Sequence, residues 1–429
     1  MNARELVLNS LLRHEKNGRF SNLENDSTLK KAQLNDADRR LYSALFFGVV
    51  QRKISLDHLI KSYSNIPGSK ISDVVRNVLR MGLYQIRYMD RIPRSAAVDE
   101  AVKLSKKRQP KSAGFVNAIL RRACVDTEDR FLVPDDPLSE LSVRYSYPQW
   151  MVKSWIDAYG KERTLEIMEA QNCPPPLFLR VNTLKTDRSS LMNKLEAIGV
   201  ECQPSALSEY GISCKDASAA LESDLFKEGY FFIQDAASQL SGILLDPGSG
   251  DTVIDLCSCP GGKSFGAAMM TGDTGRILSF DIHESKLSLV KSGALRLGIK
   301  SLSVSAQDAS VLNESLIDSA DAVICDVPCS GLGVIAKKPD VREKSEEDTK
   351  KLWQIQSAIL NNAALYTKPG GKLMYSTCTL LPRENEDVTN AFLSSHPGFR
   401  RAGKAYPMTL FPERGKNDGF FIDLFTRTE

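Results

Sequence analysis

Two cysteines lie where short apolar segments of the chain end in polar residues. Cys329 follows the segment DAVICDVP as the second residue of a Pro-Cys pair, and Cys378 follows GKLMYST. A thiolate at such a loop position can act as a nucleophile, because it stays accessible to a substrate. Most free cysteines are instead small buried hydrophobic residues. We adopt that interpretation for Cys124, Cys173, Cys202, Cys214 and Cys325.

A glycine-rich turn joins the apolar segment DTVIDLCS to the helix-forming stretch FGAAMM. Such a turn lets a ligand approach the backbone at a helix N-terminus. The P-loop pattern fails here because its first glycine would have to be residue 257, which is a cysteine, and the dinucleotide pattern GxGxxG is absent. An NTPase is therefore disfavoured. The residues expected to hold a cofactor are Cys257, Ser258, Cys259, Pro260, Gly261, Gly262 and Lys263.

Three carboxylates follow successive apolar segments downstream of this turn. Asp281 ends GRILSFD, Asp308 ends LSVSAQD, and Asp326 precedes the Pro-Cys pair. A carboxylate after the second strand of a nucleotide-binding sheet commonly holds ribose hydroxyls, and Asp308 can accept from an exocyclic amine. Each aspartate alone could equally be a surface or helix-capping residue. Since no pyrophosphate signature accompanies them, we expect a nucleoside cofactor without phosphates, such as S-adenosyl-L-methionine.

A thiolate beside a methyl donor has a specific use in pyrimidine chemistry. Addition of the thiolate to C6 of cytosine turns the ring into an enamine, whose C5 can attack a methylsulfonium. Protonated Asp326 can stabilise the charge at ring nitrogen N3, and a base must then remove the C5 proton before the thiolate leaves. Either Cys329 or Cys378 can be the nucleophile, since DNA cytosine methyltransferases attack from a Pro-Cys loop. Amino-group methyltransferases need no such cysteine, and their Asn/Asp-Pro-Pro-aromatic loop is absent.

The elements that must position these residues alternate between strands and helices from about residue 236 onward. Apolar segments such as DTVIDLCS and GKLMYST alternate with helix-forming stretches such as ESKLSLVKSGALRLG and LWQIQSAILNNAALYT. This order predicts an α/β domain of Rossmann type over 236–429, an open and mostly parallel sheet with helices on both faces. Ligands of such sheets bind beyond the carboxyl ends of the strands, where all the residues above lie.

The first 126 residues are predicted to be all-α. Apolar residues recur at helical spacing in RELVLNSLLRH, DRRLYSALFFGVVQ and ISDVVRNVLRMGLYQI, with Asn35 or Asp36 and Ser72 or Asp73 as N-caps. This segment has 24 Lys plus Arg against 12 Asp plus Glu, a net charge of +12, whereas the remaining 303 residues carry −9. A basic helical domain favours nucleic acid as a partner, and a solvated basic surface is the alternative.

Two further segments complete the predicted multidomain organisation. Residues 127–138 are polar, contain two prolines and form the predicted linker. Residues 139–235 mix helical patterns with the strand-like PLFLRVNT, which predicts a small α+β subdomain. The chain is long enough for several cores of this kind.

Composition excludes several classes of protein. With 42% hydrophobic and 25% charged residues the chain is typical of globular proteins, and it has no apolar run of the length that spans a membrane. The charged start MNARELVLNSLLRHEK lacks the features of a secretory signal, so we expect reduced thiols and a cytoplasmic location. The spacing of Cys257, Cys259, Cys325 and Cys329 does not match zinc sites. We expect no metal, no membrane and a monomer.

These motifs resemble those of the Nol/Nop/Sun family of RNA cytosine-C5 methyltransferases, and the resemblance covers nearly the whole chain. FVNAILRR at 115–122 is typical of a NusB-like helical RNA-binding domain. LRVNT at 179–183 and QDAAS at 234–238 are typical of the family's RRM-like segment and its junction with the catalytic domain. The resemblance implies 5-methylcytosine formation in RNA with S-adenosyl-L-methionine as cofactor. The NusB-like domain implies small-subunit ribosomal RNA as the partner, by analogy of fold.

The resemblance also implies roles for single residues. The turn Cys257–Lys263 falls at the family's cofactor loop. Cys378, in Ser-Thr-Cys-Thr, falls where the family has its nucleophile, and Cys329 falls where a second cysteine assists product release. Methylation of another RNA such as tRNA, and a non-catalytic RNA-binding assembly or antitermination factor, are the alternatives. The family's cofactor-binding acids correspond to Asp281, Asp308 and Asp326.

Overall fold

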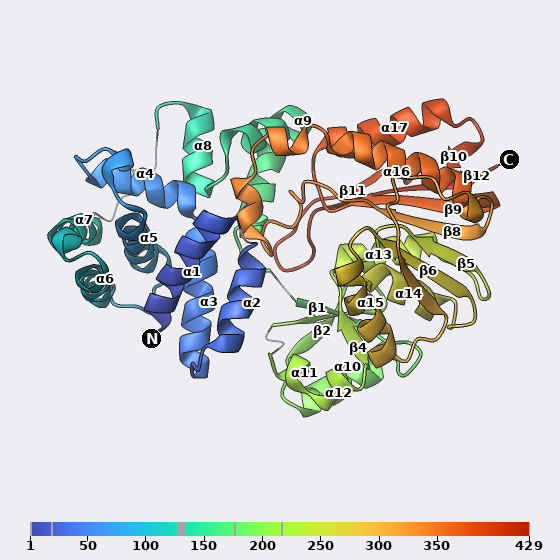
Figure 1. Cartoon of the computed structure of the whole chain (residues 1–429), viewed down its shortest axis with the longest axis horizontal. Helices are drawn as coiled ribbons and strands as arrows, with labels where there is room; N and C mark the ends of the chain where they lie inside the picture. The colour runs from blue at the N-terminus through green and yellow to red at the C-terminus, as the bar shows by residue number, and fades with distance from the viewer. Residues whose placement is uncertain (1, 19, 127–133, 176, 216–217, 429) are drawn as a thin grey trace. The chain divides into compact units, whose positions relative to one another are not determined.

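The computed structural model in Figure 1 describes residues 2–18, 20–126, 134–175, 177–215 and 218–428. The chain divides into two compact units. Unit 1 comprises the residues up to Met168 together with Lys337–Lys344, which we call the inserted segment, and unit 2 comprises Glu169–Ala336 and the residues from Ser345 onward. Part of the predicted linker, 127–133, lies outside the described residues.

Unit 1 is helical, as the sequence predicts. Two of its N-caps are those expected from side-chain type: Asn35 Oδ1 accepts from the amide of Asp38 at 2.8 Å, and Ser72 Oγ accepts from the amide of Val75 at 3.4 Å. The helices are α1 (Ala3–Asn17), α2 (Ser21–Lys31), α3 (Asp36–Gln51), α4 (Lys53–Tyr63), α5 (Asp73–Tyr88), α6 (Arg94–Arg108), α7 (Ala113–Val125), α8 (Pro137–Tyr145) and most of α9 (Gln149–Ala170), which is kinked at Gly160.

The sequence pattern does not predict α2, because the buried face of this helix is polar. Glu24 is 1% exposed and accepts from Arg13 Nε at 2.9 Å and from Thr28 Oγ1 at 3.1 Å. Hydrogen bonds and charge thus replace the apolar stripe by which a helix is usually found in a sequence.

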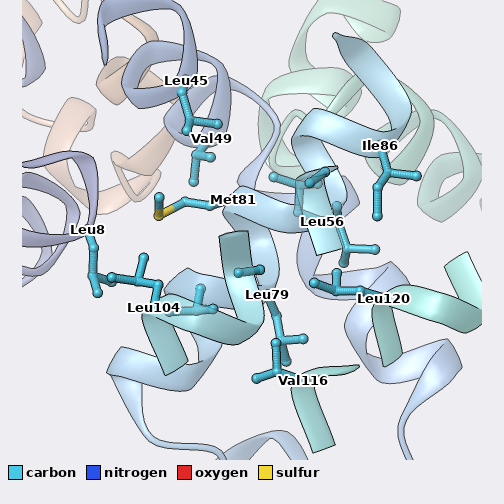
Figure 2. Close-up of a cluster of buried hydrophobic side chains, with 14 of the residues drawn as sticks. Leu8, Leu45, Val49, Leu56, Leu79, Met81, Ile86, Leu104, Val116 and Leu120 are labelled. Atoms are coloured by element: carbon cyan, nitrogen blue, oxygen red, sulfur yellow. The ribbon is translucent and has the colours of Figure 1, made fainter. Parts of the chain in front are cut away.

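The apolar core of unit 1 is built around α5 (Figure 2). Two glycines let neighbouring side chains approach their helices closely. A Cβ at Gly82 would lie 2.6 Å from Cδ1 of Leu120 on α7, and a Cβ at Gly48 on α3 would lie 1.9 Å from Cζ of Tyr84. A larger residue at either glycine would require these neighbouring side chains to shift.

The inserted segment packs within unit 1 through two charged residues. Arg342 is 4% exposed, and its Nη2 donates to the hydroxyl of Tyr147 at 2.9 Å. Glu343 accepts from Lys53 at 2.6 Å and lies 3.0 Å from His14 Nε2. Burial opposes ionisation of Glu343, but the hydrogen bond from His14 and the charge of Lys53 outweigh it and lower the pKa of Glu343 to about 2. Side chains of the N-terminal helices therefore have hydrogen-bond partners in the inserted segment, far along the chain.

Unit 2 contains a small antiparallel sheet with the strand order β2-β3-β1-β4. Leu179, Leu191, Ile212 and Phe231 belong to its core. This part confirms the predicted α+β class. The sequence pattern predicts only two of its strands, PLFLRVNT at β1 and GVECQPSAL at β2. The elements are β1 (Leu177–Val181), α10 (Arg188–Ala197), β2 (Cys202–Pro204), β3 (Gly211–Cys214), α11 (Ser218–Glu222), α12 (Asp224–Lys227) and β4 (Phe231–Ile233).

The larger sheet of unit 2 has the order β10-β12-β9-β8-β5-β6-β7, with β11 paired to β12. Strands β5 to β9 are parallel, as predicted, whereas the pairings of β12 are antiparallel. The elements are α13 (Ala236–Leu245), β5 (Thr252–Asp255), α14 (Gly262–Met270), β6 (Arg276–Asp281), α15 (Glu284–Leu297), β7 (Leu302–Ala306), β8 (Ala320–Asp326), α16 (Leu352–Tyr366), β9 (Thr367–Thr377), α17 (Glu386–Ser395), β10 (Phe399–Arg401), β11 (Met408–Leu410) and β12 (Phe420–Arg427).

Helices cover both faces of this sheet (Figure 1). Successive side chains of a strand point to opposite faces, and β8 shows the consequence. Val323 and Cys325 belong to the core that includes Ile359 of α16, whereas Ala322 and Ile324 belong to the core on the other face. Because the two faces are filled, the carboxyl ends of the parallel strands are the place left for a ligand, and the chemistry-bearing loops lie there.

Candidate active site

The turn Cys257–Lys263 connects the carboxyl end of β5 to α14. The amide of Ser258 donates to the carbonyl of Phe280 in β6 at 2.8 Å, and the amide of Gly261 donates to the carbonyl of Ser258 at 2.6 Å. Gly261 has φ +113°, and a Cβ there would lie 2.3 Å from the ring of Phe265. Only glycine satisfies both constraints, so the backbone of the turn is held in one shape at the start of the helix.

The strand-end carboxylates gather around this turn. Asp281 Oδ2 accepts from the amide of Cys259 at 3.3 Å, so the end of β6 is tied to the turn. Burial raises the pKa of the Cys257 thiol, and the nearby charges of Asp281, Asp308, Asp255 and Asp326 raise it further. The structure therefore brings together the three carboxylates that the sequence predicts and adds a fourth.

That fourth carboxylate, Asp255, ends β5 and is 1% exposed. Its Oδ2 accepts from Ser264 Oγ at 2.6 Å, while its Oδ1 is buried with no hydrogen-bond partner in the described part of the chain. Burial is the largest cause of its high pKa of about 7, and the charge of Asp326 adds to it. The strand-end argument that identified Asp281 applies equally to Asp255 and could have found it.

We expect Asp255→Asn to flatten the pH dependence of stability between about pH 5 and 7. The ordinary pKa of Asp is 3.8 and the folded value is about 7, so the folded state holds a proton that the unfolded chain releases. The associated stability is present below pH 4 and is lost as pH rises through 7, at most about 1.4 kcal/mol per pH unit. Urea unfolding of both proteins across this range, without cofactor, measures the difference. Parallel curves would contradict the prediction.

Asp326, at the end of β8, accepts hydrogen bonds from Lys263 and Ser376. Lys263 Nζ donates to Asp326 Oδ2 at 2.7 Å and to Ser238 Oγ at 3.0 Å. Ser376 Oγ, at the end of β9, donates to Asp326 Oδ1 at 2.7 Å. The Lys263 side chain is only 8% exposed, which makes its ion pair with Asp326 a fixed feature of the site rather than a surface contact. The sequence places Lys263 in the cofactor turn and does not predict this partner.

The two candidate nucleophiles lie side by side. In the parallel pairing of β8 and β9, Asp326 is opposite Ser376, so the loops that follow these strands leave the sheet at the same level. Cys329 Sγ and Cys378 Sγ are 3.3 Å apart. The hydrogen bond with Cys378 and burial raise the pKa of the Cys329 thiol well above its ordinary value. Cys329 can therefore keep its proton and donate it toward the sulfur of Cys378.

Asp308, the third predicted cofactor carboxylate, lies beyond the end of β7. It accepts from the amide and the hydroxyl of Ser310, and these hydrogen bonds lower its pKa. Among the cysteines expected to be small hydrophobic residues, Cys214 and Cys325 are buried, whereas Cys124, Cys173 and Cys202 are partly exposed. Within the described residues, no cluster of three His, Cys, Asp or Glu side chains is arranged to hold a metal, and no helix is long and apolar enough to cross a membrane.

Comparison with protein-family models assigns three parts of the chain. Residues 242–426 match the model described as 16S rRNA methyltransferase RsmB/F. Residues 1–124 match the NusB family, and residues 147–219 match an RsmF/B-like ferredoxin-like domain.

Individual proteins are similar over nearly the whole chain. A probable ribosomal RNA small subunit methyltransferase B from Bacillus subtilis (strain 168) is 37% identical, covering 98% of this chain and 97% of its own. Ribosomal RNA small subunit methyltransferase B from Salmonella typhi is 31% identical over 90% of both chains. A crystal structure of a methyltransferase homolog protein from Pyrococcus horikoshii is 26% identical with a TM-score of 0.61, covering 68% of this chain and 99% of its own.

Proposed function

Since the chain belongs to the RsmB/F family of 16S rRNA methyltransferases, we propose that it methylates C5 of a cytosine in small-subunit ribosomal RNA. The methyl donor is S-adenosyl-L-methionine, and the reaction passes through a covalent bond between Cys378 and C6 of the base. The single observation that carries this proposal is the pair of sulfurs 3.3 Å apart, close in the chain to Asp326 and its ion pair with the buried Lys263. A methyltransferase acting on an amino group has no need of two thiols.

The residues of the turn fit S-adenosyl-L-methionine. This cofactor carries an ammonium and a sulfonium group, and the negative charges of four carboxylates act on Cys257 in the turn. Asp255 Oδ1 and Ser258 Oγ are buried polar atoms that lack hydrogen-bond partners within the described part of the protein, as expected where a polar ligand completes a site. The turn Cys257–Lys263 would hold the cofactor together with Asp281 and Asp308. When bound, it supplies a methyl group as a sulfonium.

The protein's own groups account for the other steps. Cys378, as a thiolate, forms a bond to C6, and a proton passes from the Lys263 ammonium through Asp326 to N3. The electron-rich C5 then takes the methyl group. Once Cys378 is bonded to C6, its sulfur no longer adds to the pKa of Cys329. Cys329 then releases its proton to water and accepts the proton from C5. The bond between C6 and Cys378 breaks, the proton at N3 returns by the same route, and RNA leaves with 5-methylcytosine.

We propose that the helical residues 1–126 form the RNA-binding part of the protein. Their net charge of +12 supports this role, because phosphates dominate the affinity of most proteins for RNA. The substrate implies work in the cytoplasm, where ribosomal RNA is assembled into subunits.

Incubating the protein with labelled methyl donor and unmodified 16S rRNA tests the proposed function. We expect label in 5-methylcytosine after digestion of the RNA to nucleosides. Label in another nucleoside would refute the C5 chemistry. Label in tRNA but not in 16S rRNA would favour the alternative substrate, and the absence of transfer to either RNA would favour a non-catalytic RNA-binding factor.

A further inference from the structure

The peptide groups on both sides of Cys329 are held by two buried side chains. Glu384 Oε2 accepts from the amide of Ser330 at 2.9 Å, and Gln356 Nε2 donates to the carbonyl of Pro328 at 3.0 Å. The two side chains also contact each other, since Gln356 Nε2 donates to Glu384 Oε2 at 2.9 Å. Neither residue belongs to the predicted site. We infer that Glu384 and Gln356 are positioning residues that hold Cys329 for the proton removal that releases methylated RNA.

The same pair is anchored to the strand that carries the other cysteine. The hydroxyl of Tyr375, in β9, donates to the backbone carbonyl of Glu384 at 2.6 Å. Ser330 Oγ and Thr379 Oγ1, next to the two cysteines in the chain, lie 2.6 Å apart. The contacts therefore fix the Cys329 loop relative to the end of β9. Without these hydrogen bonds, the two loops would not keep the sulfurs of Cys329 and Cys378 at a defined separation.

The chemistry of the pair favours a functional over a packing role. Glu384 and Gln356 are fully buried, and the Oε1 atom of each has no hydrogen-bond partner within the described residues. An apolar pair would avoid the cost of these two Oε1 atoms, but it would remove the hydrogen bonds to the amide of Ser330 and the carbonyl of Pro328. Positions that retain such a cost are commonly those that orient reacting groups.

The charge of Glu384 also acts on Cys329. The hydrogen bond with Cys378 and burial are the main causes of the raised pKa of the Cys329 thiol, and the charge of Glu384 raises it further. A thiolate with a raised pKa is a stronger base, which suits removal of a proton from carbon.

The inference rests on the proposed function and is tested by separating methyl transfer from release. Gln356→Met removes both hydrogen bonds at nearly constant volume, and Glu384→Gln is the conservative variant. We expect Gln356→Met to methylate RNA in a single turnover at nearly the wild-type rate but to release it about 100-fold more slowly. A protein–RNA adduct that survives denaturation should therefore accumulate. Glu384→Gln, whose amide oxygen can still accept from Ser330, should accumulate less.

The control is Gln239→Met, a buried glutamine of α13 that donates to the carbonyls of Leu179 and Gln234. It should lose stability without accumulating adduct. If Gln356→Met lowers transfer and release in equal proportion, or leaves release unchanged, the positioning role is wrong. If the proposed function itself is wrong, the result differs: the wild type forms no 5-methylcytosine, and no variant forms an adduct.

Discussion

Replacing Cys378 with alanine is expected to abolish methyl transfer to RNA, lowering the rate by more than about 1000-fold, while the protein still binds S-adenosyl-L-methionine. Without the sulfur no bond to C6 can form, and C5 of cytosine is not nucleophilic by itself. The turn between β5 and α14 that is proposed to hold the cofactor does not depend on this side chain. Labelled methyl transfer and calorimetric titration with the cofactor measure the two properties separately.

The matched control is Cys173→Ala, because Cys173 is also a partly exposed cysteine of unit 2 but lies outside the site. It should turn over like the wild type. Full activity of Cys378→Ala would overturn the assignment of the nucleophile. Loss of cofactor binding in that variant would instead mean that the substitution had disturbed the turn.

Replacing Cys329 with alanine should trap the enzyme on its substrate. Cys378 can still add to C6 and C5 can still be methylated, but the base that removes the C5 proton is missing. Multiple turnover should fall by about 100- to 10,000-fold, the usual contribution of a positioned base. A complex of protein and RNA that resists denaturation should appear on gels, carrying about one methyl group per protein chain.

The variant with both cysteines replaced separates this explanation from nonspecific crosslinking. It should form no adduct, because the sulfur that bonds to C6 is absent. An adduct in the double variant, or rapid release by Cys329→Ala, would be incompatible with the proposed division of roles between Cys378 and Cys329.

Much of the fold could be predicted because its cores are apolar and periodic. The parallel strands β5 to β9 and the helices between them follow directly from that pattern. The periodic pattern does not predict strands β10 and β11, because three residues are too few to show a period. The strand β12 is buried on both faces and therefore lacks alternation, and its interior contains the fully buried Asp423, which pairs with Arg401.

The candidate site was predictable in composition but not in geometry. Strand-end residues converge in any parallel sheet, which is why Asp281, Asp326 and the two cysteines could be proposed to share a site. The register that sets Asp326 opposite Ser376 depends on the packing of whole strands and leaves no local signal in the sequence. The ion pair of Lys263 with Asp326 depends on the same register.

The position of the inserted segment has a consequence for how the protein is made. Ribosomes synthesise a chain from its N-terminus, and domains generally fold in the order in which they emerge. Unit 1 cannot complete its folding in this order, because Arg342 and Glu343 emerge only after strands β5 to β8 of unit 2 have been synthesised. Until then Tyr147, His14 and Lys53 lack partners that they have in the finished protein. The N-terminal helices thus complete their folding only when the loop that carries Cys329 has been translated.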